Sequence, residues 1–268
     1  MENKSRKAVI VTGASGGMGK EVCKILVETY DVFAFDKRPT DLKDPRIIDV
    51  VVDVTDTNSV EKAKEIVLNS GKTLQAIIHT AGIYDLDSLI EMDEQRFLKI
   101  FDVNLFGVYR INKAFTPLIE KGGKIIMVTS ELAPLDPLPF TGVYAITKSA
   151  LEKYAYSLRM ELNVLGYKVV VVRPGAVKTT LLNDSNLALD KFCDNTNLYK
   201  VNALRFKKVV NSVENKNVSP EKIAKVISKA LKKKNPKYII NVNRSFLLRL
   251  LNVLPKRLQV KIIGWIIK

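Results

Sequence analysis

Short apolar runs alternate with helical patterns along most of this chain, and this alternation constrains its fold more than any other feature. Helical spacing of apolar residues separates most of the runs, over 19–30, 59–68, 94–120 and 142–165. The runs that predict buried strands are 7–13, 31–36, 47–54, 74–82, 123–130 and 167–175. Because each crossover must return along one face, this order predicts a parallel sheet with helices on both faces. We therefore expect one α/β domain built on a single doubly wound parallel sheet.

The net positive charge of the chain is confined to its last quarter. The net charge is +15, and residues 201–268 hold 17 Lys and Arg against only Glu214 and Glu221, so the rest of the chain is neutral. One alternative function is nucleic-acid binding through Lys222–Lys237. That run ends a predicted helix and lacks interleaved aromatic residues, so we expect a solvated surface and no nucleic acid.

The amino terminus and the cysteines predict the compartment. Met1–Lys7 is polar and the apolar run behind it, Ala8–Thr12, is too short for a secretory signal. Cys23 and Cys193 lie far apart and lack metal-ligand spacing. We expect a reduced cytoplasmic protein without a metal ion. Because 47% of its residues are apolar, the chain can bury a full core.

A glycine-rich turn follows the first predicted strand. Thr12–Gly19 reads TGASGGMG, and glycines at such a turn let the backbone approach a pyrophosphate at the start of a helix. Tight packing of helix on strand would explain the same glycines. Asp36 ends the second predicted strand, where a carboxylate binds the hydroxyls of an adenine ribose and repels a 2′-phosphate. We therefore expect NAD rather than NADP, although Lys37 and Arg38 could attract that phosphate.

A tyrosine and a lysine four residues apart occur twice in the chain. Tyr144 and Lys148 follow Ser130, which stands fourteen residues before Tyr144 at the end of a predicted strand. Tyr109 and Lys113 have Gln95 at that offset and lie within a predicted helix. Residues four apart share a helix face, and a nearby ammonium group lowers the pKa of a phenol. The first pair therefore predicts an acid/base device, and the second a solvated or interface pair.

In the order of these motifs the chain resembles the short-chain dehydrogenases/reductases, over roughly residues 5–245. The resemblance implies a Rossmann-type domain over residues 1–245, a nicotinamide cofactor and a homo-oligomer. It implies catalytic roles for Ser130, Tyr144, Lys148 and Asn104. The cofactor contacts that it implies are Thr12, Gly13, Ser15, Gly17, Met18, Gly19, Asp36, Asp53, Val54, Ala81, Gly82, Tyr144, Lys148, Pro174, Gly175, Val177 and Thr179.

The resemblance also assigns a role to each catalytic residue. Tyr144 is the acid/base, Lys148 holds the nicotinamide ribose, Ser130 hydrogen-bonds the substrate oxygen, and Asn104 supports a proton path through water. Two departures stand out. The usual Asn-Asn-Ala-Gly is His79-Thr-Ala-Gly here, and we expect the single histidine to be structural or to line the cofactor. Ser130 stands fourteen residues before Tyr144, where thirteen is commoner in the family.

Two segments carry the expectations about substrate. Residues 178–218 form a lid in this family, and apolar residues recur along this segment: Leu181, Leu182, Leu187, Leu189, Phe192, Leu198, Leu204 and Phe206. They would cover an apolar substrate or pack on the domain. The tail, 246–268, is basic and apolar, and it could contact a membrane, the substrate pocket or a neighbouring subunit.

The tail weakly resembles the hydroxysteroid and retinol dehydrogenase branch. We expect a dehydrogenase or reductase acting on a lipophilic alcohol or ketone such as a steroid, retinoid or fatty compound. The alternative is a protein that binds NAD as a sensor or structural element without turnover.

Overall fold

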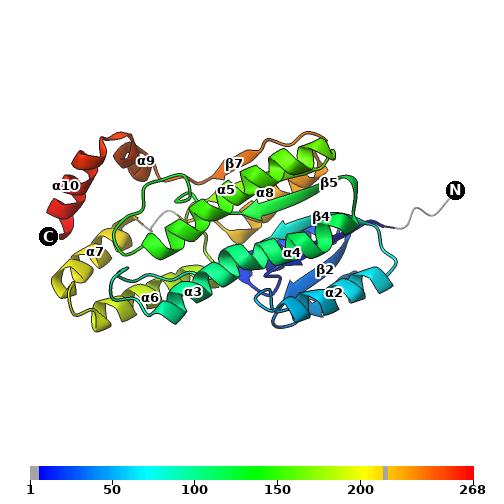
Figure 1. Cartoon of the computed structure of the whole chain (residues 1–268), viewed down its shortest axis with the longest axis horizontal. Helices are drawn as coiled ribbons and strands as arrows, with labels where there is room; N and C mark the ends of the chain where they lie inside the picture. The colour runs from blue at the N-terminus through cyan, green and yellow to red at the C-terminus, as the bar shows by residue number, and fades with distance from the viewer. Residues whose placement is uncertain (1–5, 214–216) are drawn as a thin grey trace.

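The computed structural model describes residues 6–213 and 217–268, with side chains at all of these except 180–184 and 211–213 (Figure 1). Within the described residues, seven parallel strands form one sheet in the order β3-β2-β1-β4-β5-β6-β7. The strands are β1 (Ala8–Thr12), β2 (Asp31–Asp36), β3 (Ile47–Val51), β4 (Leu74–His79), β5 (Ile119–Val128), β6 (Lys168–Pro174) and β7 (Ile239–Val242). The order reverses after β1, which confirms the doubly wound sheet.

Helices cover both faces of this sheet. Helices α1 (Gly17–Leu26) and α8 (Pro220–Lys232) pack together on one face, while α2 (Thr57–Asn69), α4 (Gly107–Phe115) and α5 (Gly142–Val164) cover the other (Figure 1). An apolar core lies on each face of the sheet, and successive side chains of β1 alternate between the two cores. Ile10 points to the side of α2, α4 and α5, and Val11 points to the side of α1 and α8. Both side chains are fully buried, as expected of a central parallel strand.

The single helix predicted over 94–120 is wrong at its end. The segment consists of α3 (Glu94–Phe101), a π-helix (η1, Asp102–Phe106), α4 and a short 3₁₀ turn (η2, Thr116–Leu118), and β5 already begins at Ile119. Pro117 lacks an N–H group and stops the helix. Strand β5 then contains an irregularity, where Gly122 has a φ of 79°. Gly122 and Gly123 interrupt the apolar pattern in the sequence, and in the structure they mark a bulge in β5.

The carboxyl-terminal third contains elements that the sequence did not define. The predicted lid segment forms α6 (Thr180–Asn195) and α7 (Lys200–Val213), and residues 214–216 of it lie outside the described residues. The short strand β7 pairs with β6 and was not predicted. The tail forms α9 (Phe246–Val253) and α10 (Lys256–Ile267), and α10 lies beside α7 (Figure 1). Among the described residues, no helix is long and apolar enough to cross a membrane.

Candidate active site

The glycine-rich turn leads from β1 into α1. Gly13 has a φ of 68°, and a Cβ there would lie 2.6 Å from the amide nitrogen of Ala81. A Cβ on Gly19 would lie 2.1 Å from the carbonyl oxygen of Gly13. The hydroxyl of Thr12 accepts a hydrogen bond from the Ala81 N–H (3.3 Å). The turn therefore leaves bare backbone and the free N–H groups of the first turn of α1, around Gly17 and Met18, at the carboxyl edge of the sheet.

Asp36 ends β2 beside this turn. Its Oδ2 atom accepts a hydrogen bond from the backbone N–H of Ser15 (3.0 Å). Across the edge, Asp53 binds the Nζ atom of Lys37 at 2.8 Å and also accepts from Thr55. Lys37 is thus held by a carboxylate. This arrangement leaves Asp36 as the charge that faces the turn.

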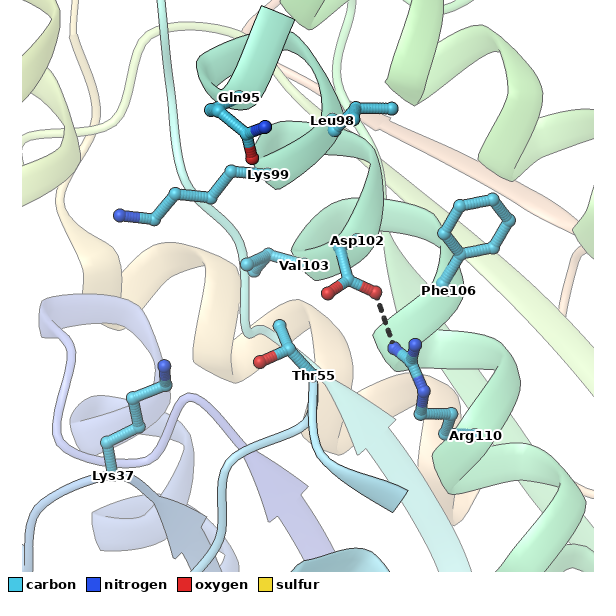
Figure 2. A pocket seen from close by; sticks show the side chains of 9 residues that line it. All are labelled: Lys37, Thr55, Gln95, Leu98, Lys99, Asp102, Val103, Phe106 and Arg110. Carbon is cyan, nitrogen blue, oxygen red and sulfur yellow. Dashed lines mark hydrogen bonds and ion pairs between the residues drawn. The ribbon is translucent and has the colours of Figure 1, made fainter.

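A pocket of about 520 Å³ adjoins the loop that carries Asp53 and Val54. In Figure 2, Lys37 and Thr55 lie on one side of it and the helical segment from α3 to α4 on the other. An ion pair of 2.7 Å between Arg110 and Asp102 borders it. Its lining residues are Lys37, Thr55, Gln95, Leu98, Lys99, Asp102, Val103, Phe106 and Arg110. The pocket lies at the adenosine end of the predicted cofactor site, away from Tyr144.

Close packing holds this end of the site together. A Cβ on Gly107, the first residue of α4, would lie 2.8 Å from a methyl group of Val54. The helix can therefore approach the loop only because this position is glycine. The sequence motifs did not single out Gly107, since its neighbour Val54 lies far away along the chain.

Three of the predicted catalytic residues, Ser130, Tyr144 and Lys148, converge at the start of α5. Tyr144 is buried, and the Ser130 side chain acts on its phenol, whose pKa it lowers. The Nζ atom of Lys148 lies 5.6 Å from the centre of the Tyr144 ring and donates to the carbonyl of Val128 (3.4 Å). The hydroxyl of Ser149 donates to the Ala133 carbonyl (2.7 Å), which fastens α5 to the loop behind Ser130. The fourteen-residue spacing therefore still brings Ser130 to Tyr144.

The electrostatics of this cluster differ from the prediction. Burial raises the pKa of Tyr144 well above its usual value, and the nearby Tyr84 adds to the rise, while the Ser130 side chain opposes it. Burial also lowers the pKa of Lys148 to about 8. The expected lowering of the tyrosine pKa by the ammonium group is thus wrong for this state of the protein, because desolvation is the largest effect on both groups.

Asn104 lies at the centre of the π-helix and is fully buried. Its amide exchanges two hydrogen bonds of 2.9 Å with the backbone of Ile83 and donates a third to Thr147 (3.1 Å). A Cβ on Gly82 would lie 3.2 Å from Asn104 Oδ1 and 3.4 Å from Lys148 Nζ. Gly82 therefore leaves the space in which the asparagine and the lysine approach each other. π-Helical turns within helices are frequent at functional sites.

His79 is a buried structural residue at the end of β4. Its Nε2 atom hydrogen-bonds Asn112 Oδ1 (2.8 Å), and the Asn112 amide donates to the Tyr154 hydroxyl (3.1 Å). Burial lowers the pKa of His79 to about 4, so the ring is neutral at neutral pH. The structural alternative that the sequence allowed for this histidine is therefore the one that the contacts support.

The segment after β6 crosses the site from the other side. The Gly175 N–H donates to Val242 (2.8 Å), and a Cβ on Gly175 would lie 2.0 Å from the carbonyl oxygen of Asn243. Pro174 and Val177 are buried, and Thr179 lies next to Gly17, where an added Cβ would be 3.4 Å from the threonine side chain. The two predicted cofactor segments therefore meet at the start of α1.

The lid residues divide into two groups. Leu189, Phe192 and Phe206 are buried in an apolar cluster with Leu86 and Ala203. In contrast, Leu187, Leu198 and Leu204 are exposed. The side chains of Leu181 and Leu182 lie outside the described residues. Only part of the segment therefore faces inward.

The second tyrosine and lysine pair is on the outer surface of α4. Tyr109 is exposed, and Lys113 Nζ lies 5.9 Å from the centre of its ring. The distinction between the two copies made from their position along the chain is therefore consistent with the structure.

Two residues near Tyr144 were not found from the sequence. The rings of Tyr84 and Tyr144 pack with centroids 4.7 Å apart. Phe140 has a φ of 65°, which is uncommon for a bulky residue, and its ring packs on Phe192 and Phe206. Both lie in loops without a helical or strand period, so no pattern in the sequence singles them out.

Known proteins are similar to this chain in sequence. A family model described as short chain dehydrogenase matches residues 7–190. The chain is 28% identical over 233 residues to 3-ketodihydrosphingosine reductase from Bacteroides thetaiotaomicron, covering 86% of this chain and 85% of that protein. It is 33% identical over 196 residues to estradiol 17-beta-dehydrogenase 2 from Mus musculus, covering 68% of this chain and 51% of that protein.

A solved structure shares the fold. The crystal structure of a short chain dehydrogenase family protein from Francisella tularensis superposes with a TM-score of 0.74 at 21% identity, covering 89% of this chain and 97% of that one. The family match begins just before β1 and ends within α6. It therefore includes the glycine-rich turn, Ser130, Tyr144 and Lys148, while α7 and the tail follow it.

Proposed function

This chain belongs to the short-chain dehydrogenase family, and we propose that it transfers a hydride between NAD(H) and a lipophilic alcohol or ketone. The observation that carries the proposal is the convergence of Ser130, Tyr144 and Lys148 at the carboxyl edge of the sheet, facing the same edge as the glycine-rich turn. Family membership supports dehydrogenase or reductase chemistry on alcohols and ketones. The cofactor, the substrate class and the residue roles below are the proposal.

The residues present fit a dinucleotide. Bare backbone at Gly13 and Gly19, free N–H groups at the start of α1 and the carboxylate of Asp36 form a run of contacts suited to a pyrophosphate and a ribose. The absent Cβ of Gly82 leaves space beside Lys148. When bound, the nicotinamide supplies or accepts the hydride.

The chain's own residues handle the substrate oxygen and its proton. In reduction, the phenol of Tyr144 donates its proton to the carbonyl oxygen, and the hydroxyl of Ser130 donates a hydrogen bond to the same oxygen. The raised pKa of Tyr144 keeps the phenol protonated at neutral pH, which suits the reduction direction. Lys148, whose ammonium group lies beside Tyr144, stabilises the resulting phenolate. Asn104 holds the loop at Ile83 and the helix at Thr147 in fixed positions relative to each other.

Two charges support NAD over NADP. Asp36 faces the turn and would repel a 2′-phosphate, whereas Lys37 is engaged by Asp53 at 2.8 Å. The sequence allowed Lys37 to attract a 2′-phosphate, but its ion pair with Asp53 opposes this role. Arg38 is exposed, and its charge helps to lower the pKa of the Asp41 carboxyl.

A lipophilic substrate is supported by the surroundings of Tyr144. The ring packs with Tyr84, Ile100 and Val143, and Tyr84 also borders the apolar cluster of the lid. The two relatives above are named for a sphingoid ketone and for the steroid estradiol. Apolar walls around the reacting group and relatives with such substrates both favour an apolar ligand.

Two further parts of the proposal concern partners. The outer face of α9 exposes Phe246, Leu247 and Val253 in a tail without acidic residues, which suits peripheral contact with an anionic membrane. Exposed Phe106 at the end of η1, Tyr109 on α4 and Met160 on α5 suit a homo-oligomer. Sedimentation with anionic vesicles and light scattering test these two parts separately.

The experiment for the central part uses purified protein and a panel of steroids, retinoids and long-chain ketones. We expect NADH oxidation with at least one of them, and tighter binding of NADH than of NADPH by fluorescence titration. Binding of NADH with no turnover on any member of the panel would favour the alternative, a sensor or structural protein that binds the cofactor. Equal affinity for both cofactors would contradict the role of Asp36.

A further inference from the structure

An apolar groove lies between the tail helix α10 and the loop that joins Ser130 to α5. Its volume is about 430 Å³, which is within the range of small-molecule sites. Its lining residues are Leu89, Pro137, Leu138, Pro139, Phe140, Gly142, Val260, Ile263, Gly264 and Ile267. None of these side chains carries a polar atom. The groove therefore suits a ligand part that makes no hydrogen bonds to side chains.

One face of α10 lines this groove. Val260, Ile263, Gly264 and Ile267 recur at the spacing of a single helix face. Glycine in the middle of a helix is unfavourable relative to alanine. A Cβ on Gly264 would meet no heavy atom within 4 Å, so neighbouring packing does not require the glycine. Its effect is to leave the groove open at this point.

The tail is fastened beside the catalytic loop. The Glu131 carboxylate, next to Ser130, accepts a hydrogen bond from the N–H of Ser245 (2.5 Å) at the start of α9. The Asn252 side chain accepts from the N–H of Asp136 (2.6 Å), and Lys256 forms an ion pair with the Asp136 carboxylate. These contacts hold α9 and α10 against the loop and fix the width of the groove.

The groove leads toward the reacting residue. Gly142 is the first residue of α5, two residues before Tyr144, and it lies against Leu89. Leu138 and Phe140 line the groove and also pack against the lid cluster that Tyr84 borders. Tyr84 in turn contacts the Tyr144 ring. Phe140 holds its left-handed backbone at this junction, and such outliers persist where the surroundings enforce them.

From these observations we infer that the groove under α10 binds the aliphatic chain of the substrate, so that the substrate is a long-chain ketone or alcohol. This inference rests on the proposed function, since it names the substrate class of that site. The aliphatic chain of the substrate lies along Ile263, Gly264 and Ile267 on one side of the groove. On the other side it lies along Leu138 and Phe140. A rigid, compact substrate would leave the groove empty.

The first test measures chain binding without turnover. The full-length protein is titrated with cis-parinaric acid, a fluorescent fatty acid, and the probe is then displaced by saturated fatty acids of 6, 8, 10 and 12 carbons below their micelle concentrations. We expect saturable binding and an affinity that rises roughly three- to fourfold per methylene. Absence of saturable binding, or affinity independent of chain length, would overturn the inference.

Substitutions at Gly264 provide the second test. Gly264→Phe fills the groove and should weaken probe binding at least tenfold, while Gly264→Ala, with one added methyl group, should shorten the best chain length slightly. Neither variant should melt at a lower temperature, because space is open at this position. Probe binding by Gly264→Phe equal to that of the wild type contradicts the inference.

Leu250→Glu on α9 is the matched control, since Leu250 is exposed on the outer surface of the tail and does not line the groove. It should bind the probe as the wild type does. If Leu250→Glu loses the probe instead, the chain binds the outer surface and the inference fails. If Gly264→Phe changes only self-association, the groove is an interface between copies of the chain.

The outcomes separate this inference from the proposed function. One outcome is that Gly264→Phe abolishes binding of the fatty-acid probe while the wild type oxidises NADH with none of the ketones tested. That outcome supports the groove as a site for an aliphatic chain and refutes the proposed enzyme activity. Turnover of ketones with the same chain-length preference in the wild type and in Gly264→Phe retains the enzyme and refutes the groove.

Discussion

The ring of Tyr84 packs against the ring of Tyr144, with centroids 4.7 Å apart and an angle of 46° between the planes. This contact contributes to the burial that raises the pKa of the Tyr144 phenol. Alcohol oxidation needs the phenolate as a base, so its rate should rise with pH. The ring of Tyr84 therefore sets where that rise occurs.

Replacing Tyr84 by alanine should move the rise to lower pH. Removal of the ring exposes Tyr144 to water and reduces the desolvation that raises its pKa. The measurement is kcat/KM for alcohol oxidation from pH 6 to 10. Tyr84→Phe keeps the ring and removes only the neighbouring hydroxyl, so it should shift the profile less. A profile of Tyr84→Ala that coincides with the wild type would show that the ring does not control the phenol.

Lys148 should limit activity on the alkaline side. Burial lowers its pKa from the usual 10.5 to about 8, so the ammonium is present below pH 8 and is lost as the pH rises above it. We expect kcat/KM for NADH, which reports on the free enzyme, to fall above about pH 8. In Lys148→Arg the guanidinium stays charged, so a slower enzyme without that fall is expected. Persistence of the fall in Lys148→Arg would assign it to another group.

Replacing Asp36 by alanine should reduce the preference for NADH. A hydrogen bond to a charged group contributes about 1.5–3 kcal/mol, so its loss weakens NADH about ten- to a hundredfold while repulsion of a 2′-phosphate disappears. The ratio of kcat/KM for NADH to that for NADPH measures the change. Asp41→Ala, an exposed carboxylate paired with Lys20 at 2.8 Å, is the control and should leave the ratio unchanged. An unchanged ratio in Asp36→Ala contradicts the cofactor assignment.

His79 should affect stability in acid rather than catalysis. Its pKa is about 4 in the folded chain and 6.5 as the usual value, so the unfolded chain binds the extra proton between these values. Stability is therefore full above pH 6.5 and is lost as the pH falls toward 4, by about 2 kcal/mol between pH 7 and 5. Urea unfolding at both pH values should show a smaller loss for His79→Asn, which cannot titrate. Equal losses in the two proteins would contradict the buried neutral ring.

Local patterns predicted much of the fold and the order of the candidate site. The continuous apolar runs at Val9–Val11 and Val169–Val172 are buried parallel strands, because residues covered on both faces need no polar alternation. Tyr144 could be distinguished from Tyr109 by what precedes each along the chain. The helical period continues past Pro117 and therefore predicts a helix at Glu120, whereas the strand bulge that follows has no sequence period of its own.

Features that depend on long-range contacts could not be predicted. The ion pair between Lys37 and Asp53 and the contact between Gly107 and Val54 join segments that are separated along the chain. The pKa of Tyr144 depends on burial, which the spacing of Tyr144 and Lys148 does not reveal. The position of α9 depends on bonds such as that between Asp136 and Asn252, across 116 residues.

The most direct measurement of the central claim follows deuterium from NADH that carries deuterium at both positions of C4 into a long-chain ketone. The account predicts an alcohol labelled at the carbon that bears the hydroxyl, formed by the wild type and by Tyr109→Phe at equal rates. Tyr144→Phe should bind NADH normally and form this product about 10²–10⁴ times more slowly. Unlabelled alcohol, or equal rates in Tyr144→Phe and the wild type, would contradict the account.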